Sequence, residues 1–399
     1  NAEVDTVVAL SVDELLLGLE TYGEQLLAMG EDGNGYVINP SDYSYQNQTI
    51  EQLSDMQFGG WSKADGEFQY TDADDFTIEL KGSDIIEVGF GNERVTTPTD
   101  LQGGNDYIDG GCGGDIDTLY GDDGELPDGI TSIGGNDVIY GKSGNDIISG
   151  GLQGDTIYGN EGDDEITGGA NQTNYIYGGD GDDTIDGGIA GDFIFGGAND
   201  DTINGSSGGD WIYGDEGDDT INGENDGDIL VGGSGSDEVN GNAGDDLLIV
   251  VNELILDTTG VSTYDGGGDN DKLVVKVDAN ITLSDNSLVI GNEDTDTVGS
   301  IESALLVGGD SINIINVSAF SEATRILGLD GNDELIGGSS QDTILGGNGD
   351  DTIKGNAGDD NISGESGDDE ITGGDDNDII DGGLGSNIMS GSGGDDYYS

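Results

Sequence analysis

The chain has 399 residues, with 86 acidic and eight basic side chains, a formal net charge of −78, no histidine and one cysteine. This charge excludes nucleic acid and anionic membrane surfaces as natural partners, and no apolar run reaches the roughly 18 residues of a membrane span. The lack of histidine excludes Ser-His-Asp and Cys-His catalysis and H-E-x-x-H zinc sites. We therefore expect no enzyme, no membrane insertion and no internal disulfide.

Residues 1–100 carry no repeat. A capping box begins at Ser11, and apolar residues then recur at helical spacing, which predicts one amphipathic helix over 12–29. Alternating segments at 76–80 and 85–90 predict strands. We expect a β-rich N-terminal cap with one helix, because a solenoid needs its first coil covered. A separate binding module is the alternative.

Residues 101–249 form a first repeat block, which is interrupted at first and then regular. Gly178 to Ile249 is a run of nonapeptides without insertion, each with Gly in first place, Asp in sixth place and Ile, Leu or Val in eighth place. Six residues rich in glycine can make a tight turn, and the next three can make a short strand whose middle side chain points inward. Two units would close one coil of 18 residues.

Residues 250–327 lose the aspartate phase but keep strand-like segments, with one isolated repeat-like unit at Gly266–Val274. This stretch is either a wider part of the same solenoid or a small β insertion. From Gly328 to residue 399 a second repeat block runs in strict phase, with Asn387 in place of one aspartate. The sequence therefore predicts a parallel β-solenoid with two repeat blocks.

The sixth-place aspartates are the candidate metal ligands. Stacked coils would bring carboxylates to about 4.8 Å from one another, where they repel unless a cation lies between them. A hard cation with six to eight oxygen ligands fits carboxylates and backbone carbonyls, and Ca²⁺ suits such a turn better than Mg²⁺. The candidates are Asp106, Asp117, Asp137, Asp146, Asp155, Asp164, Asp183, Asp192, Asp201, Asp210, Asp219, Asp228, Asp237, Asp246, Asp333, Asp342, Asp351, Asp360, Asp369 and Asp378.

The pattern G-G-x-G-x-D-x-U-x, carried by units such as Gly178–Asp186, resembles the RTX (repeats-in-toxin) family. This resemblance implies a right-handed, all-β parallel β-roll that binds multiple Ca²⁺ ions, and a secreted protein. Low hydrophobicity with high net charge is also typical of disordered chains. The strict repeat phase argues against disorder, provided that cations are present.

Successive units alternate between two types, which gives the solenoid two unlike faces. On one face, seventh and ninth places are Val138/Tyr140, Thr156/Tyr158, Tyr175/Tyr177, Phe193/Phe195, Trp211/Tyr213 and Ile229/Val231, which we call the aromatic row. The other face carries mostly threonine, asparagine and acidic residues. An exposed aromatic row exceeds the apolar patch that a soluble monomer tolerates. It is covered by the predicted helix or by residues 250–327, or it contacts another copy or a carbohydrate ligand.

These features predict a calcium-dependent structural protein that is extracellular, either secreted or associated with the cell surface. It would fold outside the cell and assemble with copies of itself, as a homo-oligomer or polymer, into a surface layer, fibre or matrix. The alternative is a secretion and folding module of a larger exoenzyme, toxin or adhesin. The chain starts at Asn1, not at Met, and shows no leader or C-terminal secretion signal, which leaves room for that alternative.

Overall fold

The computed structural model describes residues 136–251, 260–291 and 295–399, together with ten short strands between residues 20 and 120. The chain divides into two compact units, residues 1–195 and 196–399. Every element in the described part is a β-strand, as the sequence predicts for the two repeat blocks, and that part contains no helix able to cross a membrane.

The described nonapeptides turn where their second and fourth places adopt positive φ, with Gly337–Leu345 as an exception. Gly179 and Gly181 take φ of 127° and 137° in one nonapeptide, and Asn160 and Asn199 take φ of 79° and 80° in two others. Glycine and asparagine adopt this left-handed backbone with the least strain. The glycines of the repeat therefore produce the turn, as the sequence indicates.

The eighth-place side chains form the core. Those from Ile139 to Ile380 are at most 1% exposed, because the middle residue of each short strand points inward, whereas in the last two nonapeptides Met389 is only partly buried and Tyr398 is 46% exposed. The column comprises Ile139, Ile148, Ile157, Ile166, Ile176, Ile185 and Ile194 in the first unit, and Ile203, Ile212, Ile221, Leu230, Val239, Leu248, Leu273, Leu335, Ile344, Ile353, Ile362, Ile371 and Ile380 in the second.

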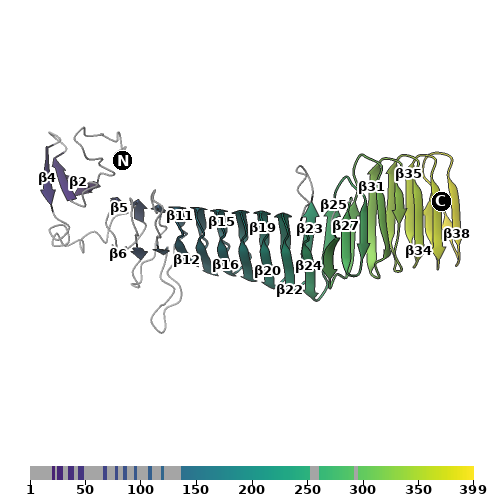
Figure 1. The fold of residues 1–399 in the computed structure, drawn as a ribbon, viewed down its shortest axis with the longest axis horizontal. Coiled ribbons are helices and arrows are strands. Elements are labelled where there is room, and N and C mark those ends of the chain that lie inside the picture. Colours follow the sequence, from purple (N-terminus) through teal and green to yellow (C-terminus); the bar gives the residue numbers. More distant parts are fainter. Residues whose placement is uncertain are drawn as a thin grey trace. The chain divides into compact units, whose positions relative to one another are not determined.

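In the first unit, two parallel sheets form the walls of the coils (Figure 1). One contains β5 (Gly66–Gln69), β7 (Asp84–Glu87), β9 (Tyr107–Asp109), β11 (Val138–Ser143), β13 (Thr156–Glu161) and β15 (Tyr175–Asp180). The other contains β6 (Thr77–Glu79), β8 (Arg94–Thr96), β10 (Thr118–Tyr120), β12 (Ile147–Gln153), β14 (Glu165–Asn171) and β16 (Thr184–Ile189). Strand β17 (Phe193–Ala198) follows β16. Ile139 pairs with Ile157, and Ile157 with Ile176, so the register superposes the eighth places.

The predicted helix over 12–29 requires correction where the structure describes it. Glu20–Tyr22 (β1) and Gln25–Met29 (β2) are antiparallel strands, and the sheet continues through β3 (Gly35–Asn39) and β4 (Ser44–Gln48). Tyr22 pairs with Gln25, which leaves only Gly-Glu between the strands. A Gly-X pair is a two-residue hairpin signal, and it outweighs the helical spacing of the leucines. The rest of the predicted helix lies outside the described residues.

The second unit contains the remaining strands (Figure 1). One sheet runs through β19 (Trp211–Glu216), β21 (Ile229–Ser234), β23 (Leu247–Val251), β25 (Lys272–Lys276), β29 (Ser303–Val307), β31 (Ala323–Asp330), β33 (Thr343–Asn348), β35 (Asn361–Ser366), β37 (Ile379–Asp381) and β39 (Tyr397–Tyr398). The other runs through β18 (Thr202–Ser207), β20 (Thr220–Asn225), β22 (Glu238–Ala243), β24 (Thr263–Gly268), β26 (Ile281–Ser284), β27 (Ser287–Ile290), β28 (Thr295–Gly299), β30 (Ile314–Ala319), β32 (Glu334–Ile336), β34 (Thr352–Ala357), β36 (Glu370–Asp375) and β38 (Ile388–Ser392).

The stretch between the two repeat blocks interrupts only one of these sheets. There, β26 and β27 form an antiparallel hairpin, β27 also pairs antiparallel with β28, and β24 pairs parallel with β28. The opposite sheet continues without a break, because β25 pairs parallel with β29 and β29 with β31. This stretch therefore combines solenoid coils with a short β insertion.

Candidate metal centre

The predicted aspartates lie inside the turns rather than on the surface. From Asp137 to Asp378, every sixth-place aspartate predicted as a ligand is at most 3% exposed. Asp106 and Asp117 lie outside the described residues. A buried carboxylate needs compensation from hydrogen bonds or from a cation.

One oxygen of each carboxylate is fixed by the next coil toward the N-terminus. The backbone N–H of Asp146 donates to Oδ1 of Asp164 at 2.7 Å, and that of Asp351 donates to Oδ1 of Asp369 at 2.9 Å. The same bond recurs along both edges of the coils, so each edge carries a ladder of buried N–H···Oδ1 bonds. The ladder orients every carboxylate in the same way.

The second oxygen has no hydrogen-bond partner at many of these turns. The Oδ2 atoms of Asp164, Asp219, Asp228, Asp246, Asp333, Asp351, Asp360, Asp369 and Asp378 are buried and accept no hydrogen bond. Leaving a buried carboxylate oxygen unsatisfied is costly, and native proteins rarely do so. Each such oxygen therefore requires a proton or a cation.

Backbone carbonyls converge beside these oxygens. A methyl group added to Gly328 would lie 2.5 Å from Oδ2 of Asp333 and closer still to the carbonyl oxygen of Gly346. Any side chain in first place would therefore collide with the carboxylate, so glycine is required there. The two oxygens face one small space, and carboxylate and carbonyl oxygens are the ligands that calcium prefers.

No three acidic or cysteine side chains converge on one point among the residues that the structure describes. The oxygens gathered at a turn are one carboxylate oxygen and backbone carbonyl oxygens. Asp342 differs from this arrangement, because its Oδ2 accepts the Gly338 N–H at 2.7 Å and its Oδ1 accepts both the N–H and the hydroxyl of Thr324 at 2.7 Å. The protein itself satisfies both oxygens of Asp342.

Burial raises the pKa values of these aspartates. The pKa of Asp164 rises to about 8, mainly because burial disfavours the charged form, and the carboxylates of Asp146 and Asp183 on adjacent coils add to the shift. The pKa of Asp360 rises to about 7 for the same reasons, with Asp342 and Asp378 as its neighbours. Without a cation the buried carboxylates would take up protons near neutral pH, whereas calcium would replace the proton.

Sequence reasoning missed Asp271 and Asn174 in equivalent positions, and it identified Asn387 only as a replacement for aspartate. Asp271 accepts the Asp246 N–H at 2.9 Å, and its place in the isolated unit at 266–274 was the signal that could have identified it. Asn174 and Asn387 continue the ladder through their amide oxygens at 2.9 Å from the donors Asp155 and Asp369. One extra residue in Gly168–Tyr177 shifts the nonapeptide phase, so a count of nine residues does not place Asn174 in sixth place.

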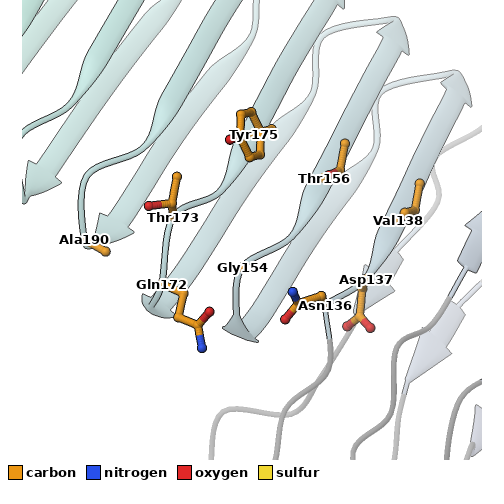
Figure 2. A pocket seen from close by; sticks show the side chains of 9 residues that line it. All are labelled: Asn136, Asp137, Val138, Gly154, Thr156, Gln172, Thr173, Tyr175 and Ala190. Carbon is orange, nitrogen blue, oxygen red and sulfur yellow. The ribbon is translucent and has the colours of Figure 1, made fainter.

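An open groove lies beside this insertion in the first unit, as Figure 2 shows. It is lined by Asn136, Asp137, Val138, Gly154, Thr156, Gln172, Thr173, Tyr175 and Ala190. Apart from Asp137, which is 1% exposed, the lining side chains are uncharged. The groove is therefore a neutral site on a strongly acidic protein.

Comparison with known families agrees with this geometry. The family model described as the RTX calcium-binding nonapeptide repeat matches residues 133–249 and 320–398 through overlapping copies. The chain is an RTX-repeat protein. The RTX repeats imply that it binds calcium, and the buried Oδ2 atoms and glycine carbonyls are ligands of the kind that calcium requires.

One solved structure resembles the RTX protein at low similarity. It is a hyperactive, Ca²⁺-dependent, β-helical antifreeze protein from an Antarctic bacterium, with 20% identity over 77% of this chain and 83% of that chain, at a TM-score of 0.30. No curated protein matches the chain.

Proposed function

We propose that this RTX protein is a calcium-dependent structural protein that is secreted, folds outside the cell and assembles with copies of itself into a surface layer, fibre or matrix. The aromatic row is the observation that supports self-association. In the first unit its ninth-place rings stack in sequence, with Tyr140 and Tyr158 4.8 Å apart, Tyr158 and Tyr177 4.9 Å apart, and Tyr177 and Phe195 5.0 Å apart.

The stacked rings make a flat, ordered apolar surface. Their planes lie within 7° of parallel, and the seventh-place rings of Tyr175 and Phe193 stack in the same way at 5.1 Å. Tyr175 remains 45% exposed. Aromatic side chains in a rigid array bury much area at little entropic cost, so a second copy of this face is a suitable partner.

The charge supports folding outside the cell. Before calcium binds, 86 acidic residues repel one another, and each turn buries carboxylates that cannot all remain ionised. Extracellular calcium modules bind with dissociation constants of about 10⁻⁴ to 10⁻³ M. Cytosolic calcium would leave such a chain unfolded, whereas calcium outside the cell would fold it.

The test of self-association is a double substitution, Tyr158→Ser with Tyr177→Ser. The control is Thr167→Ser with Thr184→Ser, which changes ninth and seventh places on the opposite sheet of the same unit. We expect light scattering to rise on calcium addition for the unaltered and control chains but not for the aromatic variant. Circular dichroism must show calcium-induced folding in all three chains. Scattering that rises equally in all three would contradict the proposal.

A carbohydrate is a second candidate partner, and the groove in Figure 2 supports it. Its lining combines the half-exposed ring of Tyr175 with the neutral side chains of Thr156, Gln172 and Thr173. Sugar rings stack on aromatic faces, and amides and hydroxyls bond their hydroxyl groups. Calorimetry with neutral oligosaccharides should give binding that Tyr175→Ser abolishes, and no heat from the unaltered chain would exclude this ligand.

A further inference from the structure

A turn outside both matched repeat regions has the geometry of the repeat sites. Gly266 to Val274 lies between residues 249 and 320, where the family model has no match. Gly267 and Asp269, in second and fourth places, take φ of 97° and 84°. Leu273, in eighth place, is fully buried. This nonapeptide therefore folds as an RTX nonapeptide does, although the residues on either side of it do not follow the repeat.

Asp271 occupies sixth place in this unit and is oriented as the repeat aspartates are. It is 1% exposed, its Oδ1 accepts the Asp246 N–H at 2.9 Å, and its Oδ2 is buried without a hydrogen-bond partner. A methyl group added to Gly266 would lie 2.5 Å from that Oδ2 and closer still to the carbonyl oxygen of Ser300. This matches the arrangement of Gly328, Asp333 and Gly346.

The next coil supplies a second carboxylate. The Asp271 N–H donates to Oε2 of Glu302 at 2.9 Å, so Glu302 takes the role that the next sixth-place aspartate has in the repeats. The β26–β27 hairpin and β28 lie between the two residues in sequence, while β25 and β29 pair directly. Because 31 residues separate Asp271 from Glu302, a nonapeptide count cannot relate them.

The local charge is suited to a cation. The carboxylates of Asp246, Glu302 and Asp245 add like charge beside the buried carboxylate of Asp271. The site thus places a buried, unsatisfied oxygen among other acidic groups. A divalent cation would satisfy that oxygen and offset the repulsion.

The chain shows how such a turn is completed without a metal. The Nδ2 of Asn174 donates to the carbonyl oxygen of Gly187 at 3.3 Å and to Oδ1 of Asp192 at 3.1 Å. The Nδ2 of Asn387 donates to the carbonyl oxygen of Gly382 at 2.6 Å. The amide of Asn174 thus faces the carbonyl of the next coil that elsewhere lies beside a carboxylate oxygen, whereas the amide of Asn387 bonds the first-place carbonyl of its own turn. Asp271 has no such donor on its Oδ2.

We propose that Asp271 holds a calcium ion outside the RTX repeat blocks, with Oδ2 of Asp271 and the Ser300 carbonyl among its ligands and Glu302 supporting it. This ion would tie the coil of Asp271 to that of Glu302 across the hairpin insertion. The proposal requires the calcium binding implied by the repeats but neither self-assembly nor secretion.

The test counts calcium ions per folded chain by equilibrium dialysis of the full chain at saturating Ca²⁺. Asp271→Asn should bind one ion fewer than the unaltered chain, because the new amide would complete the turn as Asn174 does. Asp269→Asn is the control, since it removes an exposed charge two residues away and should keep the full count. An Asp271→Asn chain that folds and binds as many ions as the unaltered chain would overturn the proposal.

Glu302→Gln keeps the test decisive if Asp271→Asn does not fold. Glutamine can still accept the Asp271 N–H, so the coil should form, but the charge beside the site is lost. We expect the full ion count with a several-fold weaker affinity at one site, and a titration identical to that of the unaltered chain would contradict the proposal. Light scattering on the same samples separates this result from self-assembly: calcium binding without assembly would contradict only the proposed function.

Discussion

At the scale of single residues, the two oxygens of each sixth-place carboxylate have different tasks. Oδ1 receives a backbone N–H from the preceding coil, for example from Asp219 to Asp237 at 3.1 Å, and so fixes the stacking. Oδ2 faces carbonyl oxygens and accepts no hydrogen bond at turns such as Asp219. One side chain thus joins two coils and also offers a ligand atom.

Removing one such carboxylate should loosen its own repeat block. Asp219→Ala leaves the Asp201 N–H without its acceptor, a bond of 2.8 Å, and removes one calcium ligand. We expect a loss of about 1–3 kcal/mol from the unpaired donor alone, confined mainly to the block that contains it. Hydrogen exchange should show faster exchange around β18–β22 than around β33–β36. Glu216→Ala, an exposed change nearby, serves as control, and equal loosening of both blocks would contradict this expectation.

Lowering the pH should stabilise the folded chain without calcium and destabilise it with calcium. In the calcium-free folded chain the pKa values of Asp164 and Asp360 are about 8 and about 7, above the ordinary value of 3.8. The folded chain then binds more protons than the unfolded chain between roughly pH 4 and 8, so its stability falls as pH rises through that window. With calcium, protons compete with the metal, and stability should fall as pH decreases.

Urea unfolding at pH 5 and pH 8 measures this effect. One sample is freed of calcium with a chelating resin, and the other contains saturating calcium. The calcium-free sample should show a folding transition at pH 5 and none at pH 8, where its carboxylates are ionised, and the calcium-loaded midpoint should be higher at pH 8 than at pH 5. A calcium-free transition that is present at pH 8 and absent at pH 5 would show that the buried carboxylates are not protonated in the folded state.

At the scale of elements, each strand depends on the strands directly above and below it. Ile353 in β34 is fully buried, and β34 pairs with β32 and β36. Ile353→Ala should destabilise this block by about 2–5 kcal/mol, whereas Ile353→Val should cost about 0.5–1.5 kcal/mol. Thermal unfolding in calcium, followed by circular dichroism, should rank the two variants in this order. Equal midpoints would mean that the eighth place does not form the core.

The sequence predicted the repeating elements well because their period is local. Gly in first place, Asp in sixth place and an apolar residue in eighth place specify the turn, the ladder and the core, and the described strands follow them. The sequence did not predict the antiparallel sheet β1–β4, because its leucines also fit a helix and only the Gly-Glu pair indicated the hairpin. It did not predict the contact between Asp271 and Glu302 either, because an insertion separates these two residues in the sequence. The unequal roles of Oδ1 and Oδ2 cannot be read from spacing.

At the scale of the whole molecule, charge and calcium should decide whether the chain is folded. At neutral pH the calcium-free chain combines a net charge of −78 with a narrow core of single aliphatic side chains, so removal of calcium should unfold it. Excess EDTA should abolish the β signal in circular dichroism and increase the hydrodynamic radius, and added calcium should restore both. An unchanged spectrum and radius in EDTA would refute calcium-dependent folding.

The N–H···Oδ1 ladder also gives a repeat block two unlike ends. In the block from Gly328, each coil donates toward the C-terminus, as in the bond of 3.0 Å from the Asp360 N–H to Asp378 and that of 3.2 Å from the Asp378 N–H to Asp396. A coil stack cut at any point therefore presents N–H donors at one cut face and carboxylate acceptors at the other. Two such faces complement each other only head to tail, and a head-to-tail contact that does not close on itself generates a polar filament rather than a symmetric dimer.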